Sequence, residues 1–146
     1  MRTWTYQQLT AESDVVAIVQ PLENKPNSEK LDWPPSAHGV DTTFKVLSCL
    51  KGQLPTETLV LRHFIYHHDM PPDGGRLIDF LPGPLAIRGT IELNNGKEDW
   101  TFNGLIPEWL AFLKRNHDGT FSPTAGQLDP DISFKELHGL SLFQAF

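Results

Sequence analysis

The densest group of side chains able to bind a metal or move protons is His63, His67, His68 and Asp69. A helix would place His63 and His67 one turn apart, and that spacing suits a transition-metal ion. The segment is rich in branched and aromatic residues, however, and this composition favours a strand. On a strand the two histidines are roughly 13 Å apart, too far for one ion to bridge. We therefore expect His67, His68 and Asp69 to be solvated at a strand end, with metal binding as the alternative.

Nucleophilic chemistry has little support in the sequence. Cys49 is the single cysteine, so the chain can form neither an internal disulfide nor a thiolate metal cluster. No basic residue or histidine stands beside it in the sequence to activate it, and we expect a packed or idle thiol. Ser36 near His38, and Ser48 near Cys49, lack the glycine pattern of a nucleophile elbow, and no glycine-rich phosphate loop is present. The sequence therefore predicts no catalytic residue and no cofactor.

Paired carboxylates are the other possible source of acid and base chemistry. Glu92 is expected to face Asp99 across a hairpin, with Asp79 upstream. Like charges on the solvent-facing side of a hairpin are tolerated at small cost in stability. No further catalytic motif accompanies these carboxylates. Asp129 and Asp131 lack the remaining ligands of a calcium loop. We interpret these carboxylates as surface groups.

One aromatic residue stands apart from the expected core. Trp33 lies in a proline-rich stretch, residues 21–39, that we predict to be a long loop. An exposed tryptophan there would be an anchor for another protein. The alternative is that Trp33 folds back over the end of the domain. A second predicted loop covers residues 68–84, so the two loops together form the expected contact surface.

Charge and composition exclude several classes of protein. Lys and Arg number 12 against 18 Asp and Glu, the net charge is −6, and no stretch gathers positive charge. Nucleic acid is therefore not an expected partner. No apolar run approaches the roughly 20 residues of a membrane span. No secretory signal precedes Thr3, and we expect either a cytoplasmic chain or an exported domain whose signal peptide is missing from this sequence.

Short-range patterns predict a mainly β chain. Thr5 and Gln8 fit a capping box for a helix over residues 6–12. Asn95-Gly96 predicts a tight hairpin in which Ile91 faces Trp100, and we expect this aromatic side to be the buried one. Alternating or β-branched runs predict strands, and these cover residues 15–19, 40–50, 58–66, 77–81, 108–114 and 120–122. The alternation over residues 40–50 predicts a half-buried strand with Ser48 and Leu50 on the same face as Phe44. Residues 132–137 fit either a strand or a closing helical turn.

Four of these segments resemble, in their order, the netrin-like and metalloproteinase-inhibitor-like barrels, an OB-type fold that also occurs in uncharacterised bacterial proteins. They are Ser13–Val19, Thr43–Gly52, Trp109–Leu113 and Asp118–Phe121. The resemblance implies a small Greek-key barrel of five to seven strands and makes residues 108–114 a strand. It implies no inhibitor activity, because those inhibitors place an N-terminal cysteine on the catalytic zinc and this chain has no cysteine before Cys49.

We therefore expect one domain over residues 1–146, an OB-like barrel with a short N-terminal helix and a hairpin inserted at about residues 68–107. Because one fold hosts many activities, the barrel says little about chemistry. Our first hypothesis is a noncatalytic module that binds a protein or a small ligand at the barrel-end loops. The second is a small metal-binding protein or hydrolase that uses His63, His67, His68 and Asp69.

Overall fold

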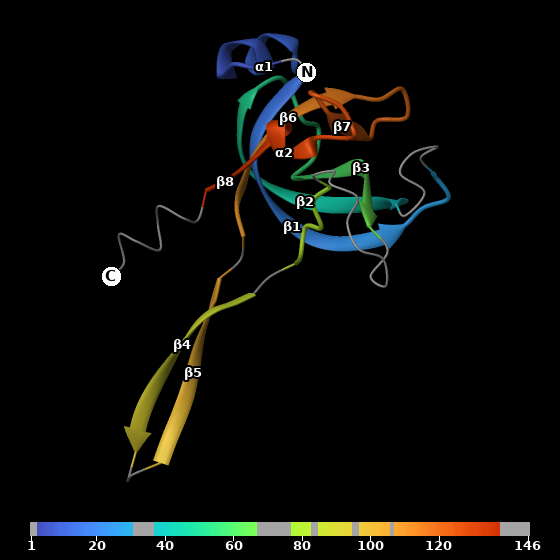
Figure 1. Cartoon of the computed structure of the whole chain (residues 1–146). Coiled ribbons are helices and arrows are strands. Elements are labelled where there is room, and N and C mark those ends of the chain that lie inside the picture. The colour runs from blue at the N-terminus through green and yellow to red at the C-terminus, as the bar shows by residue number, and fades with distance from the viewer. Residues whose placement is uncertain are drawn as a thin grey trace.

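A computed structural model of the chain describes residues 3–30, 37–66, 77–82, 85–94, 97–105 and 107–137 (Figure 1). Its elements, in chain order, are α1 (Tyr6–Glu12), β1 (Val15–Pro26), β2 (Ala37–Lys51), β3 (Thr58–Tyr66), β4 (Leu85–Asn94), β5 (Lys97–Leu105), β6 (Trp109–Arg115), β7 (Phe121–Pro123), α2 (Pro130–Ser133) and β8 (Phe134–Glu136).

Five of the strands close into a barrel. The sheet order is β1-β2-β3-β7-β6-β8, and β1 also pairs with β6, which leaves β8 as an extra strand on β6. Around the barrel the strands follow the closed order β1-β2-β3-β7-β6. If the five barrel strands are numbered one to five along the chain, this order is 1-2-3-5-4. The β3–β7 pair is parallel and the other pairs are antiparallel. This is an OB-like Greek-key arrangement, as expected from the sequence.

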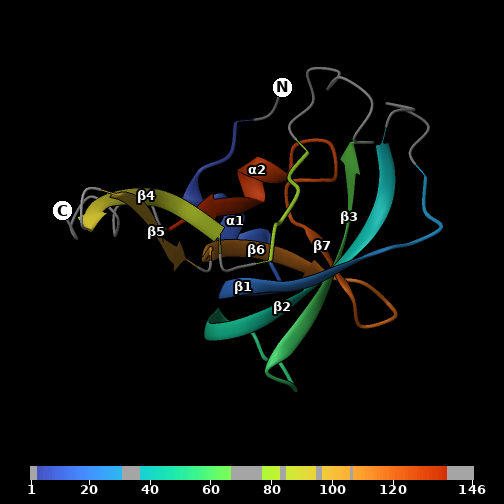
Figure 2. The ribbon, with the colours of Figure 1, turned by 90° about the horizontal axis from the view of Figure 1, so that it is seen from below.

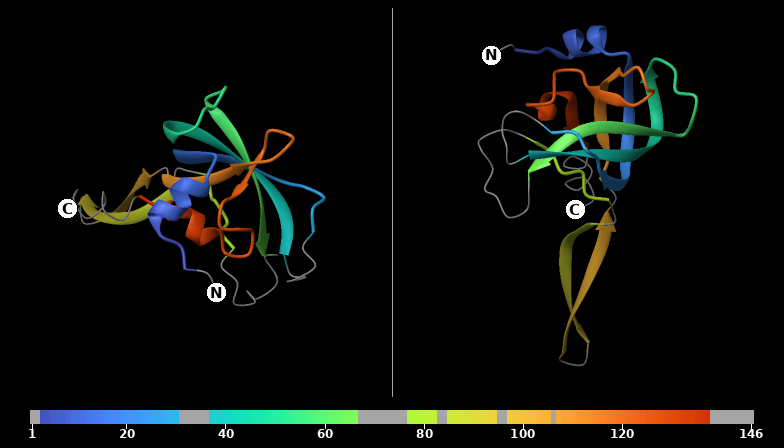
Figure 3. Two further views of the ribbon diagram at one scale, coloured as in Figure 1. Left: turned by 90° about the horizontal axis from the view of Figure 1, so that it is seen from above. Right: turned by 90° about the vertical axis from the view of Figure 1, so that its right-hand side faces the viewer.

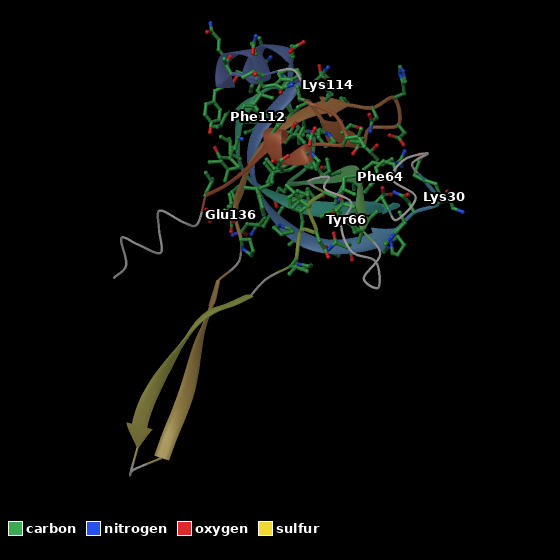
Figure 4. The ribbon with its side chains drawn as sticks, in the orientation of Figure 1. Lys30, Phe64, Tyr66, Phe112, Lys114 and Glu136 are labelled. Carbon is green, nitrogen blue, oxygen red and sulfur yellow. The ribbon has the colours of Figure 1, made fainter. Side chains whose placement is uncertain are left out.

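The first part of β1, residues 15–19, is buried on both faces, which explains its unbroken apolar run. Val15, Ala17 and Val19 point into the barrel core, whereas Val16 joins a second cluster with Leu9 of α1 and Phe112 of β6. Figure 4 shows Phe112 beneath α1, where its ring lies 6.1 Å from that of Tyr6. The helix therefore covers the outer side of the barrel at β1 and β6.

The predicted helix cap is confirmed in detail. Thr5 accepts a hydrogen bond from the Gln8 amide, and the Gln8 side chain accepts one from the Thr5 amide. At the other end of α1, the buried Ser13 hydroxyl bonds to the Leu9 carbonyl and to Thr124. A seven-residue helix is marginal alone, so these end contacts and Leu9 hold it in place.

Two predicted boundaries are wrong. Residues 21–39 are not one loop, because β1 continues to Pro26 and β2 begins at Ala37. Pro21 is tolerated because the β1–β6 ladder ends at Val19, and Pro21 lies beside an irregularity of the β1–β2 ladder. Residues 77–81 are not a strand: residues 77–82 form no regular element, and Phe80 is fully buried.

The predicted hairpin is confirmed in its register. Ile91 pairs with Trp100, Glu92 with Asp99 and Leu93 with Glu98, as a two-residue turn requires. The β4–β5 pair forms its own two-stranded sheet, and Figures 1 and 3 show it extending away from the barrel. The expectation that its aromatic side is buried concerns side chains outside the described part of the structure.

Phe80 is the centre of the barrel core. Its ring lies between 4.7 and 5.2 Å from four other rings, those of Phe44, His63, Trp109 and Phe134. These rings come from β2, β3, β6 and β8, so a single side chain from an irregular segment joins four strands. The side-chain amide of Asn24 donates to the Phe80 carbonyl at 2.8 Å and so connects residues 77–82 to β1.

We predict that Phe80→Ala destabilises the protein by about 3–5 kcal/mol, because it removes a fully buried ring and leaves a cavity. Equilibrium urea unfolding measures this loss. Leu81→Ala is the matched control, since the neighbouring Leu81 is 52% exposed and should change the stability little. Equal effects of the two substitutions would contradict the central place of Phe80.

Candidate functional site

Four of the five candidate partner-binding or metal-binding residues lie outside the described part of the chain. Trp33, His67, His68 and Asp69 belong to residues 31–36 and 67–76. The structure therefore does not test the predicted partner anchor or the solvated strand end. It does place His63, which is fully buried on β3.

His63 belongs to a buried hydrogen-bond chain inside the barrel. Its Nε2 lies 2.6 Å from the Thr42 hydroxyl, and that hydroxyl donates a short bond to the Asn24 side-chain oxygen. Because the Thr42 proton is directed to Asn24, Nε2 of neutral His63 must carry the proton that Thr42 accepts. The chain continues through the Asn24 amide to the Phe80 carbonyl. His63 is thus committed to internal contacts that join β1, β2 and β3.

The barrel interior holds His63 neutral. Burial lowers the pKa of His63 to about 4, and the backbone of Phe64 and the Asp41 carboxylate oppose this shift only in part. Its Nδ1 atom makes no hydrogen bond. Within the residues that the structure describes, no three His, Cys, Asp or Glu side chains are grouped as metal ligands. His63 is therefore a structural residue of the core in this arrangement.

A concave surface of the described residues lies away from His63. A cleft of about 840 Å³ opens between the end of β2, the β2–β3 connection and the β6–β7 turn. Figure 2 shows the connection and the turn on the same side of the barrel. This volume falls within the roughly 300–1,000 Å³ of ligand sites. Its lining consists of Val46–Cys49, Gly52–Leu59, Arg115, Gly119 and Phe121.

Apolar side chains supply much of the cleft surface. Val46 and Leu54 pack against the barrel core with one side, and Phe121 belongs to the core itself. Leu47 is 41% exposed. Polar groups are placed singly among them. Such a lining suits a ligand with an apolar body and a few polar contacts.

Arg115 joins the two sides of the cleft. Its guanidinium donates to the Gln53 carbonyl at 2.6 Å and lies 5.5 Å from the centre of the Phe121 ring. Its backbone amide donates to Asp14 at the start of β1. These contacts hold the β2–β3 connection beside the β6–β7 turn.

The β6–β7 turn is ordered by its own polar side chains. Asp118 accepts hydrogen bonds from the Thr120 hydroxyl at 2.6 Å and from the Thr120 amide at 3.0 Å. These bonds lower the pKa of Asp118. Arg62 of β3 lies 3.0 Å from the same carboxylate and 3.4 Å from Asp41. The turn therefore presents Gly119 to the cleft from a fixed position.

Cys49 lies in the cleft wall and is exposed, so of the two expected alternatives, a packed or an idle thiol, the packed one is wrong. Its Sγ donates to the carbonyls of Lys51 and Gly52 at 3.3 and 3.4 Å. No base bonds to it in the described part of the chain, so the arrangement provides no activated nucleophile. Ser48 and Leu50 are exposed too, although the alternation of the strand predicted them inside. The reason is that the β2–β3 ladder ends at Lys45 and Thr58, so β2 extends past β3 here.

Comparison with protein families, with curated proteins and with solved structures finds no match to this chain. Within the described residues, no helix has the length and apolar character needed to cross a membrane.

No motif marks the cleft in the sequence. Its residues belong to the end of a predicted strand and to a proline-containing connection, and neither carries a chemical signature. One signal was present, namely Lys51-Gly52 at the end of a strand, since glycine there indicates a special backbone conformation. Gly52 has φ of +85°, and a Cβ atom built on it would lie 2.3 Å from the Asp14 carbonyl oxygen.

We predict that burial of neutral His63 makes the protein less stable in acid. The folded-state pKa is about 4 against 6.5 for the ordinary group, so the unfolded chain binds the proton first on acidification. Neutral His63 therefore contributes to the free energy of unfolding above pH 6.5. This free energy falls by about 3 kcal/mol as the pH drops to 4. Urea unfolding across this range measures the slope.

His63→Gln should remove this part of the pH dependence, since glutamine can still donate to Thr42 and does not titrate. His117→Gln is the control, because His117 is exposed in the β6–β7 turn. An unchanged slope in His63→Gln would show that His63 is not the group responsible.

We predict that Gly52→Ala, at the edge of the cleft, lowers the free energy of unfolding more than Gly119→Ala does. Both glycines have positive φ, so each substitution introduces left-handed strain of about 1–2 kcal/mol. Only Gly52→Ala adds a clash with the Asp14 backbone, while a Cβ on Gly119 meets nothing within 4 Å. The clash should cost about 1–3 kcal/mol more. Urea unfolding measures the difference, and equal losses would contradict the close approach at Gly52.

Proposed function

We propose that this protein is a noncatalytic binding module and that the cleft beside the end of β2 is its ligand site. The observation that supports this most is the cleft of about 840 Å³, with its largely apolar lining and its single arginine bridging the two walls. The proposal moves the contact surface from the two predicted loops to the β2–β3 connection and the β6–β7 turn.

The charged and reactive groups of the cleft support binding over catalysis. Glu57 and Arg115 are the ionisable residues of the lining besides Cys49. The Arg115 guanidinium contacts the Gln53 carbonyl and the Phe121 ring, so it shapes the site. General acid–base or nucleophilic chemistry needs a group paired with a base or an orienting partner. The alternative, a metal-binding protein or hydrolase that uses His63, His67, His68 and Asp69, stays untested, and kinship with netrin-like barrels stays a prediction.

The cysteine in the cleft wall gives a direct test. Cys49 is the single thiol of the chain, so a library of small disulfide-containing fragments reports on this cleft alone. We expect fragments with an apolar body to bind in the cleft as well as to the thiol. Releasing them from Cys49 should therefore need a reductant concentration at least tenfold higher than releasing them from a control thiol. Intact-protein mass spectrometry reads the attachment. The control is Cys49→Ser combined with Ser28→Cys, since Ser28 is exposed outside the cleft.

A second pair of variants locates the binding energy. Leu47→Asp places a charge in the apolar wall and should abolish the preference for apolar fragments. Leu22→Asp is the matched control, because Leu22 is 47% exposed on β1 outside the lining. Fragment retention that is the same at Cys49 and at the control thiol would overturn the proposal.

A further inference from the structure

One edge of β5 is open in the projecting hairpin. Strand β5 pairs with β4 along one edge, and among the described residues no strand pairs with its other edge. Residues 100–105 of this edge contain no charge and no proline. Edges of this kind accept a further strand unless lysine, proline or a covering segment blocks them. A two-stranded sheet is also marginally stable by itself in water, so a third strand would stabilise the hairpin.

Strand β8 leads the chain toward this edge. Three residues separate the end of β5 from the start of β6, and Figure 1 shows the two strands end to end. Strand β8 runs antiparallel to β6 and reaches Trp109, the first residue of β6, with Glu136. The Leu137 amide then donates to the Glu108 carbonyl at 3.0 Å, which extends the ladder one step beyond β6. Each further residue of such a ladder lies one position closer to β5.

The register of this ladder defines which residues would meet. Continued unchanged, it places residues 140–146 opposite residues 99–105 of β5. Leu140 then falls opposite Leu105, and Phe143 falls opposite Phe102. Residues 138–146 contain no Asp, Glu, Lys, Arg or proline, so nothing in this segment opposes pairing with an uncharged edge.

The hydrogen bonds of β6 show which of its residues face this side. Successive residues of a strand direct their backbone groups to opposite edges. The Leu137 amide donates to Glu108 and the Thr124 amide donates to Phe112, so the even-numbered residues of β6 face β8 and β7. The odd-numbered residues therefore face β1, which pairs along the other edge.

The hairpin leaves the same set of residues open on β5. Asn94 and Lys97 flank the two-residue loop and pair with each other. Residues that flank such a loop are hydrogen-bonded through the turn, so the odd-numbered residues of β5 face β4. The even-numbered residues, among them Trp100, Phe102 and Gly104, therefore direct their amides and carbonyls to the open edge. A strand that continues from β8 along β6 meets these groups without a change of register.

We propose that residues 140–146 add an antiparallel third strand to the open edge of β5, at the register that β8 and β6 already set. The occupant of this edge is thus a segment of the same chain. The edge lies beyond the start of β6, whereas Arg115 at the end of β6 lines the ligand cleft. The strand pairing is therefore independent of the proposed ligand site.

Paired cysteines test the register in the whole protein. Cys49→Ser gives a background without thiols. Thr101→Cys with Gln144→Cys places two cysteines directly opposite each other at a pair without backbone bonds, where Cα atoms about 4.5 Å apart suit a disulfide. Thr101→Cys with Ala145→Cys is the matched control, since residue 145 would belong to the other face. We expect the first pair to cross-link within one chain at least tenfold faster than the second.

Amide hydrogen exchange tests the strand without added cysteines. The amides of Trp100, Phe102 and Gly104 would be open to solvent in a two-stranded hairpin, and the third strand should protect them. Ser141→Pro removes a donor that would face β5 and should lower this protection at least tenfold. Gln144→Pro is the matched control, because residue 144 would direct its amide away from β5.

Three outcomes would contradict the pairing. Cross-linking of the control cysteines at the same rate or faster would overturn the register. Fast exchange at the even-numbered residues of β5, or equal effects of the two prolines, would overturn strand addition itself. Cross-links formed only between two copies, seen as covalent dimers in non-reducing gel electrophoresis, would overturn pairing within one chain.

Discussion

The structure depends on β1 serving two neighbours at once. Its first five residues, Val15–Val19, pair with β6, while the β1–β2 ladder runs from Val16 to Pro26. This double pairing closes the sheet and removes two edges, which is the physical advantage of a barrel over an open sheet. It also explains why β1 is apolar on both faces, with Ala17 inside the barrel and Val16 under α1.

Closure leaves an interior that the barrel strands alone do not fill. Phe80 enters it from the irregular segment before β4 and meets rings from four strands. The same interior contains a polar chain from His63 through Thr42 to Asn24, which ends on the carbonyl of Phe80. Buried polar groups are costly unless bonded, so this chain also specifies the register in which β1, β2 and β3 meet Phe80.

The cleft follows from a difference in strand length. Strand β2 has 15 residues and β3 has 9, so the ladder between them ends before β2 does. The connection from Gly52 to Glu57 cannot continue the sheet, because Pro55 lacks a donor and Gly52 turns sharply against the Asp14 backbone. The β6–β7 turn then closes the cleft from the opposite side through Arg115 and Gly119. A surface with an unpaired edge and an apolar wall is thus produced by the fold itself.

Local chemistry in the sequence determined much of this protein. The capping box at Thr5 and Gln8, the Asn95-Gly96 hairpin register, and the branched or alternating segments of β1, β2, β3 and β6 all act between near neighbours, so they can be recognised without coordinates. The tertiary structure decided the rest. Pro21 was compatible with a strand because β6 pairing ends before it, and Phe80 was core because closure left a space for its ring. Cys49 became exposed because β3 begins too late to cover it, and such long-range pairings leave no local signal in the chain.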